Sequence, residues 1–252
     1  MHRDALRALL DEWFEPARFT DAAENGLQVE GKAEVARVVT GVSANRTLIE
    51  RAIAVGADAI VVHHGLVWGG GIRRLDGWLR ERVALLVAHD ISLFAFHLPL
   101  DAHPTLGNNA GLCDALDVDE ASRVPFGRYK GASIGFVGSL KTSLPFSRFV
   151  ARASDVVGPA RAAFGDAARV VRTVAVCSGG APDLLHEAIT ARADVYVTGE
   201  DTEWVKAVAE ESGTGFVALG HHRTERFGAM RLAARLATSG LEATFVDVEN
   251  PA

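Results

Sequence analysis

Two stretches of the chain share one order of apolar and polar positions. Residues 35–65 (VARVVTGVSANRTLIERAIAVGADAIVVHHG) and 170–200 (VVRTVAVCSGGAPDLLHEAITARADVYVTGE) each read as apolar strand, small-residue turn, amphipathic helix, Ala-Asp and second apolar strand. Apolar runs such as AIVV and VYV are typical of strands buried on both faces of a parallel sheet. The pattern predicts a duplicated strand–helix–strand unit.

The aligned stretches share individual residues as well as the pattern. The coincidences include Arg37 with Arg172, Ser43 with Ser178, and Ala57-Asp58 with Ala193-Asp194. The offset changes from 135 to 136 residues at the turn, as one inserted loop residue would require. Duplication matters because it would allow the strand ends of both halves to converge on one site.

The similarity continues beyond each stretch. A helix (WLRERVALLVAHD) and a strand (ISLFAF) lead to HLPLD, and a helix (TEWVKAVAEESG) and a strand (GFVAL) lead to GHHRTE. Each half therefore ends a strand in His-x-x-x-acid, from His97 to Asp101 and from His221 to Glu225. We predict an α/β protein with duplicated lobes and helices on both faces of its sheets.

Residues 123–150 are rich in Gly and Ser and contain short apolar runs. They predict an edge hairpin that opens the second lobe rather than a linker. We therefore expect the first lobe to comprise residues 1–122 and 216–252, and the second lobe residues 123–215.

Composition narrows the function classes. The 252 residues are 48% hydrophobic, enough for a substantial core, and the net charge of −6 gives no overall attraction to nucleic acid or an anionic membrane. Two cysteines are too few for a disulfide framework, which favours a reducing compartment. The N-terminal MHRDALRALLDEWF predicts an amphipathic helix rather than a signal peptide, and no apolar run is long enough to span a membrane. We expect a soluble, cytoplasmic protein.

Histidines concentrate directly after apolar strands. His63-His64, His97 and His221-His222 all occupy such positions, where open α/β sheets bind their ligands. Adjacent residues of a strand point to opposite faces, so His63 and His64 would share a ligand only if the chain turned, as Gly65 permits. Otherwise each would serve its own ion. One structural and one exposed histidine is an equally good interpretation of this motif alone.

The other two motifs also have plain alternatives. If a helix begins near His221, its imidazole and the Glu225 carboxylate lie on one face. Glu225 alone could instead be an acid favoured by the helix dipole. Asp101 could merely cap the turn in DAHPTLGNN, which is rich in turn-forming residues.

Taken together, the motifs favour a metal centre over independent structural histidines. Imidazole and carboxylate ligands without thiolate suit Zn, Fe, Mn, Ni or Co. Five or six ligands exceed the needs of one tetrahedral ion, and a carboxylate bridging two ions is the economical arrangement. A pair of ions activates a bridging hydroxide and clamps a substrate oxygen. The predicted ligands are His63, His64, Asp101, His221 and Glu225.

The remaining motifs give weaker indications of function. The glycines at 69–71 lack the pattern of a phosphate loop, and neither cysteine belongs to a Cys-x-x-Cys pair. Ser178-Gly179-Gly180 could bind an anion at a helix N-terminus, although a tight turn explains it equally well. Asn25-Gly26 predicts a structural turn.

The same motifs carry a family resemblance. ENGLQVEG, VVHHG, FHLPLDAHPTLGNN, VTGE and GHHRTER, in this order along nearly the whole chain, resemble the YbgI-type or NGG1-interacting-factor-three-like family. The resemblance implies two interlinked α/β lobes, a toroidal homo-hexamer and two divalent metal ions per chain. It implies one ion on His64 and Asp101, the other on His63 and His221, and a bridging Glu225.

The resemblance also bears on residues around the ions. It implies that His97 is an extra ligand or orients the ligands. Glu200 occupies the repeat position of His64, and we expect it to line the cavity or transfer protons. His222 replaces a Tyr found in many relatives, so it either contacts substrate or is a tolerated replacement.

The activity has three interpretations. A metal-dependent hydrolase is preferred, with a metal-bridging hydroxide that would attack a phosphorus or carbon centre and with His97 or Glu200 moving protons. Its substrate is open: a small molecule, a nucleotide or a phosphoester would fit. The GTP cyclohydrolase I type 2 label used in the family is a specific version, although no purine pocket is evident. A non-catalytic ring that binds DNA or handles metal is the third; Arg73-Arg74 and Arg80-Arg82 would line its pore, unless they form a solvated face.

Overall fold

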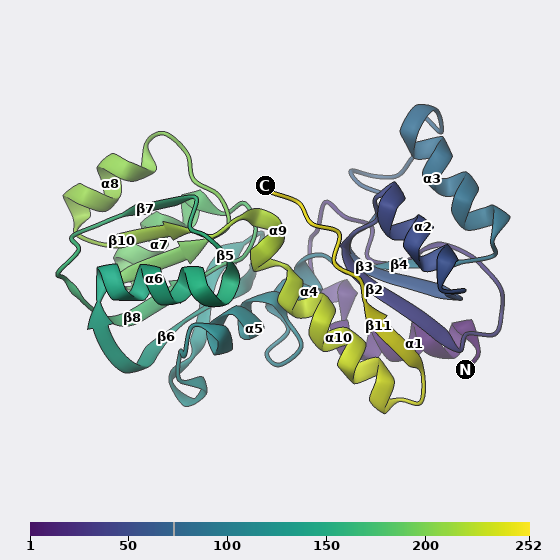
Figure 1. Cartoon of the computed structure of the whole chain (residues 1–252), viewed down its shortest axis with the longest axis horizontal. Helices are drawn as coiled ribbons and strands as arrows, with labels where there is room; N and C mark the ends of the chain where they lie inside the picture. The colour runs from purple at the N-terminus through teal and green to yellow at the C-terminus, as the bar shows by residue number, and fades with distance from the viewer. Residues whose placement is uncertain (73) are drawn as a thin grey trace. The chain divides into compact units, whose positions relative to one another are not determined.

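The computed structural model describes residues 1–72 and 74–252, and its described strands form a five-stranded and a six-stranded sheet (Figure 1). Each sheet belongs to one compact unit. The first unit comprises Met1–Leu100 and Gly228–Glu249, and the second comprises Asp101–Phe227 and Asn250–Ala252. The prediction of an α/β protein with duplicated lobes is confirmed.

The first unit contains the five-stranded sheet, in the order β1-β4-β3-β2-β11. Strands β2, β3, β4 and β11 run parallel, and β1 is antiparallel to β4. Its elements are α1 (Arg3–Phe14), η1 (Pro16–Arg18), β1 (Gly26–Val29), β2 (Arg37–Ser43), α2 (Arg46–Ala54), β3 (Ala59–His64), α3 (Gly77–Ala88), β4 (Ser92–Ala95) and β11 (Glu242–Phe245). Helices α4 (Leu98–Ala102) and α10 (Arg226–Thr238) each contain a boundary between the units.

Apolar helix faces cover both sides of this sheet. Leu6 and Leu10 of α1 pack with Phe94 of β4 on one side. Leu48 of α2 packs with Ile60 of β3 on the other. Each fully buried Leu contributes roughly 1.5–3 kcal/mol relative to exposure. The strands are therefore buried on both faces, as their continuous apolar runs predicted.

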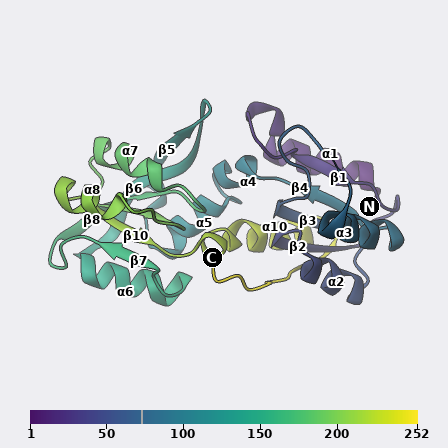
Figure 2. The same ribbon diagram turned by 90° about the horizontal axis from the view of Figure 1, so that it is seen from above.

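The second unit contains the six-stranded sheet, in the order β5-β6-β8-β9-β10-β7. Strands β8, β9 and β10 run parallel, and β5, β6 and β7 are antiparallel to their neighbours. Its elements are α5 (Asn108–Ala115), η2 (Glu120–Ser122), β5 (Val124–Tyr129), β6 (Ala132–Pro145), α6 (Phe146–Val157), β7 (Ala162–Phe164), β8 (Val170–Val176), η3 (Pro182–Leu184), α7 (Leu185–Thr190), β9 (Val195–Thr198), α8 (Val205–Ser212), β10 (Gly215–Ala218) and α9 (His221–Thr224). Figure 2 shows α6 and α7 on opposite sides of this sheet.

Strands β5 and β6 form the predicted edge hairpin. Lys130 and Gly131 connect them, and both have positive φ (46° and 94°), as a type I′ turn requires. The unit boundaries differ from the expected lobe boundaries at 122/123 and 215/216. Helix α5 belongs to the second unit because Leu112 and Leu116 lie in its core, and β10 pairs with β9 and β7.

The strand registers demonstrate the duplication. Val38 of β2 pairs with Ala59 of β3, and Val174 of β8 pairs with Val195 of β9. Both members of the second pair lie 136 positions after their counterparts, so the two units align without a loop insertion. The three parallel strands β4-β3-β2 correspond in order to β10-β9-β8.

This register corrects two predicted equivalences. At a constant offset of 136, Arg37 corresponds to Thr173 rather than to Arg172. Ser43 likewise corresponds to the residue after Ser178. The identical residue types at an offset of 135 are therefore not structural equivalents, because the strand pairing fixes the offset at 136.

The Ala-Asp motif has the same role in both units. Asp58 Oδ2 accepts hydrogen bonds from two backbone N–H groups at the start of β2, at 2.7 and 2.8 Å. Asp194 Oδ2 accepts from two backbone N–H groups of β8, at 2.9 and 3.0 Å. Lys32 also pairs with Asp58. Burial raises the pKa of Asp58, but hydrogen bonds from Lys32 and the two amides outweigh it and lower the pKa overall.

The helices are short. The longest in the described part of the chain, α10, has 13 residues, whereas spanning a bilayer takes about 20. Across residues 1–72 and 74–252, no helix combines the length and apolarity that a membrane crossing demands.

Replacing Asp58 or Asp194 with alanine would leave two backbone amides without the hydrogen-bond acceptor that the carboxylate provides. Asp58→Ala and Asp194→Ala should each lower the free energy of unfolding by about 1–3 kcal/mol, measured by urea denaturation. Asp155→Ala, on an exposed position of α6, is the matched control and should change little. Because the pKa of Asp58 is lowered, its contribution is present above the unfolded pKa of about 3.9 and is lost as pH falls through the folded value. A difference between Asp58→Ala and wild type that persists unchanged at lower pH would contradict this assignment.

Candidate metal centre

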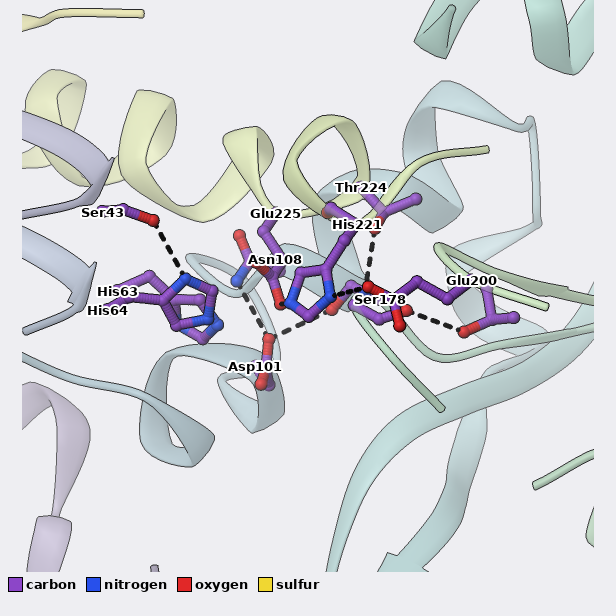
Figure 3. Close-up of polar contacts among 12 residues, drawn as sticks. Ser43, His63, His64, Asp101, Asn108, Ser178, Glu200, His221, Thr224 and Glu225 are labelled. Carbon is purple, nitrogen blue, oxygen red and sulfur yellow. Dashed lines mark hydrogen bonds and ion pairs between the residues drawn. The ribbon is translucent and has the colours of Figure 1, made fainter. Parts of the chain in front are cut away.

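His63 and His64 end strand β3 in the first unit. His63 is fully buried, and its Nδ1 lies 3.1 Å from the Phe96 carbonyl oxygen. Because a carbonyl only accepts, this contact places the ring proton on Nδ1 and the basic lone pair on Nε2. His64 Nδ1 lies 3.1 Å from Ser43 Oγ, on the neighbouring strand β2 (Figure 3).

The two adjacent imidazoles lie together rather than on opposite faces. Their ring centroids are 4.5 Å apart, and the His97 ring lies 5.0 Å from His63 and 5.6 Å from His64. One nitrogen from each ring lies within 4.8 Å of the others, a group able to hold a metal ion. The β3–β4 ladder ends at Val62, whereas β2 still pairs with β3 as far as His64. We call these three residues the imidazole cluster.

Gly65 is required for close packing, not for a left-handed turn. Its φ is not positive, but a Cβ would collide with the side chains of Gln28 and Ala95. Gln28 Oε1 accepts hydrogen bonds from the amides of Leu66 (2.7 Å) and Val67 (3.2 Å). The glycine thus lets Gln28 fix the chain just after the histidines.

Asp21 positions His97, and no pattern in the sequence pointed to it. The His97 Nδ1 donates to Asp21 Oδ1 at 2.8 Å, and the Leu98 backbone amide and the Asn25 side-chain amide donate to Asp21 Oδ2 at 3.0 Å each. Burial raises the pKa of Asp21, but the His97 and Asn25 hydrogen bonds and the His97 charge hold it well below its usual range. Asn25, expected in a plain turn, also accepts from the His97 amide at 2.7 Å.

In the second unit, Asp101 is 6% exposed and held by two donors. Asn108 Nδ2 donates to its Oδ1 at 2.9 Å and Ser178 Oγ donates to the same oxygen at 3.1 Å (Figure 3). Asn109 extends this network, accepting from the Ser178 amide at 2.7 Å and donating to the Ile134 carbonyl at 2.7 Å. Both asparagines follow a predicted turn, and nothing in their spacing marked them as partners of Asp101.

His221 lies between two carboxylates of the second unit. Its Nε2 is 3.1 Å from Glu225 Oε1, and its Nδ1 is 2.7 Å from Glu200 Oε1. Burial lowers the pKa of His221, but the hydrogen bonds and charges of Glu225 and Glu200 raise it to about 9. A ligand oxygen of Glu225, itself 3% exposed, lies within 4.8 Å of one of Asp101. We call Asp101, Glu200, His221 and Glu225 the acid–imidazole cluster.

The expected contact between residues four apart is present, although the helix is not continuous. Glu225 is the C-cap residue of α9, with φ −102° and ψ 3°, and α10 starts at the next residue. The two His-x-x-x-acid motifs are not strict equivalents. His97 and His221 are 124 positions apart in the sequence. The strands that precede them are offset by only 123 positions, because the Phe96 amide bonds to the Val62 carbonyl as the Leu219 amide bonds to the Thr198 carbonyl. Gly220, with φ 96°, is the extra residue.

The Ser178-Gly179-Gly180 segment is a tight turn rather than an anion site. The Ser178 amide donates to Asn109, and the Gly179 amide donates to Thr224 Oγ1 at 3.0 Å. Gly179 has φ 70°, and a Cβ there would collide with the Glu225 carboxylate. The turn therefore packs directly against the acid–imidazole cluster.

Two of the arginines expected to line a pore contact other side chains of the same chain. Arg73 lies outside the described residues. Arg74 pairs with Asp76 at 2.5 Å, and Arg82 lies over the Trp78 ring at 4.7 Å. These contacts engage two of the four arginines within the chain itself.

Comparisons with known proteins agree with these features. A profile of the family described as Duf34/NIF3 (NGG1p interacting factor 3) matches residues 1–251. The GTP cyclohydrolase 1 type 2 homolog of Neisseria meningitidis serogroup B is 42% identical over 243 residues, 96% of each chain. The solved structure of protein ybgI, described as of unknown function, is 38% identical with a TM-score of 0.93. That of TTHA1606 from Thermus thermophilus is 31% identical with a TM-score of 0.87, and both structures match over 100% of each chain.

Gly179→Ala should destabilise the protein more than the backbone strain of an alanine at positive φ would by itself. Gly240→Ala is the matched control, because Gly240 also has positive φ (83°) but a Cβ there meets nothing within 4 Å. We expect Gly240→Ala to lower the free energy of unfolding by about 1–2 kcal/mol, and Gly179→Ala to lower it further through the collision with Glu225. Equal losses in chemical denaturation would show that the turn does not pack against the carboxylate.

Proposed function

Because the chain belongs to the Duf34/NIF3 (NGG1p interacting factor 3) family, we propose that it is a metal-dependent hydrolase with two divalent transition-metal ions per chain. The carrying observation is that ligand-type side chains gather at the carboxyl ends of the central strands in both units, with their ring nitrogens oriented by specific partners.

The donor set fits such ions. The proposed ligands are His63, His64, Asp101, His221 and Glu225. Imidazole and carboxylate without thiolate suit Zn, Fe, Mn, Ni or Co. The Phe96 carbonyl orients His63, and the Glu200 carboxylate holds Nδ1 of His221, which directs Nε2 of each ring toward a ligand position.

We propose that the imidazole cluster and the acid–imidazole cluster both supply metal ligands, as the family resemblance implies. The first provides imidazoles, and the second provides the Asp101 and Glu225 carboxylates that a pair of ions needs for charge balance and bridging. The chain itself links them, since Asp101 follows His97 by four residues. His64 and Asp101 would hold one ion, His63 and His221 the other, and Glu225 would bridge.

When bound, the ions would acidify water and polarise a substrate oxygen. The protein's contribution is orientation and proton transfer. His97 is held at Nδ1 by Asp21, which leaves Nε2 as the atom that would accept or deliver a proton. Glu200, anchored on His221 Nδ1, acts first as a positioning residue and could pass a proton along that contact.

The proposed substrates are nucleotides or other phosphoesters. Ligands on strand ends and loops favour catalysis over a closed structural metal site. The printed name of the relatives makes opening of the GTP ring the specific alternative, so GTP belongs in the substrate panel. A non-catalytic DNA-binding ring has less support, given the net charge of −6 and the engaged Arg74 and Arg82. The proposed assembly remains a homo-hexamer, which light scattering would test.

Elemental analysis of untagged protein tests the proposed ligands and the number of ions. Wild type should carry close to two ions per chain. Glu225→Ala should lose most of both ions because it removes the bridge, and His64→Ala should lose at least the ion that His64 would hold. His89→Ala, at an exposed position after α3, is the matched control. Loss of only one ion in Glu225→Ala would show that Glu225 does not bridge the two ions. Absence of metal that Mn, Zn, Fe and Ni cannot restore would overturn the proposal.

Proton transfer by His97 predicts a defect in turnover rather than in metal content. With whichever phosphoester or nucleotide is hydrolysed, His97→Gln should lower kcat by roughly 10²–10⁴-fold and remove one limb of the pH–rate profile. Glu200→Gln should lower kcat less and keep both limbs. An unchanged pH profile in His97→Gln, with full metal content, would assign His97 to orientation alone.

A further inference from the structure

Trp68 is a partly exposed aromatic residue beside the imidazole cluster. It is 37% exposed, and its ring centroid lies 5.1 Å from His97 in an edge arrangement and 5.9 Å from His64. The residue thus presents a flat apolar surface next to two groups of the proposed centre.

The backbone around Trp68 is fixed. Trp68 forms an antiparallel bridge with Ala23, flanked by hydrogen bonds from the Gly69 amide to the Ala22 carbonyl (2.7 Å) and from the Glu24 amide to the Val67 carbonyl (3.1 Å). The indole Nε1 donates to the Gly65 carbonyl at 3.0 Å. The single polar atom of the ring is therefore satisfied, and its face is held in one orientation before any ligand arrives.

The residues after Trp68 carry no side chains. Gly69, Gly70 and Gly71 all have positive φ (60°, 87° and 108°), and a Cβ on any of them would meet nothing within 4 Å. The run is not a phosphate loop, but it turns the chain sharply into open space. It also places no side chain from these three positions over the exposed part of the indole.

We infer that Trp68 is a substrate-contacting residue that stacks the base of a nucleotide while the phosphate lies toward the imidazole cluster. This inference rests on the proposed function and narrows its substrate class to nucleotides. Every base has a π face, and an indole is the largest flat partner a protein offers. If Trp68 only shielded the imidazoles from water, it would affect ligands with and without a base equally.

Isothermal titration of metal-loaded protein with GMP and with ribose 5-phosphate separates these roles, since the two ligands differ by the base. Wild type should bind GMP more tightly. Trp68→Ala should weaken GMP binding by roughly 5- to 100-fold and leave ribose 5-phosphate unchanged, and Trp68→Phe should lose less. Trp78→Ala removes another exposed indole, 64% exposed on α3 under Arg82, and should change neither affinity.

Two results would overturn the inference. One is an equal loss for both ligands in Trp68→Ala. The other is wild-type affinity for GMP no greater than for ribose 5-phosphate, including no detectable binding of either. Elemental analysis and turnover of the same samples report on the proposed function separately. A base-dependent loss in Trp68→Ala without hydrolysis would retain the stacking role and reject the hydrolase.

Discussion

Placing imidazoles and carboxylates at the ends of apolar strands costs free energy unless each buried polar atom gains a partner. The local architecture in each unit supplies these partners. In the first unit the Phe96 carbonyl meets His63, and Asp21 meets His97. In the second, Asn108 and Ser178 together satisfy one oxygen of Asp101. The chemistry of the site therefore depends on residues that themselves bind no ligand.

Glycine makes this crowding sterically feasible. A side chain at Gly65 would displace Gln28, and one at Gly179 would displace the Glu225 carboxylate. A turn preference accounts for the positive φ of Gly179 but predicts neither close contact, because a glycine required by a neighbouring side chain resembles any other glycine in a sequence. The same carboxylate–imidazole pairing occurs in both units, as Asp21–His97 and Glu200–His221, although the two carboxylates occupy unrelated places in the chain.

The duplication explains why the fold was predictable in outline. Apolar runs defined the parallel strands, and the Ala-Asp motif located the start of the second strand in each unit. Asp58 and Asp194 prove to be the residues that fasten the first strand to the second. The predicted equivalence of Arg37 with Arg172 was wrong by one residue, because the strand pairing makes Thr173 the counterpart of Arg37. The unit boundaries also differ from the expected lobe boundaries, because α5 and β10 contribute apolar residues to the core of the second unit.

By itself, the sequence determined the strand-end positions of His63, His64, His97 and His221, because the alternation of apolar strands and helices is a local property read along the chain. It determined the proximity of His221 and Glu225 for the same reason, since residues four apart on a helical turn are neighbours. Only the tertiary structure decided which distant residues orient them. Asp21 lies 76 residues from His97, and Ser178 lies 77 residues from Asp101. Such contacts depend on how the strands are ordered in each sheet and on how loops pack over their ends, and no local periodicity encodes that.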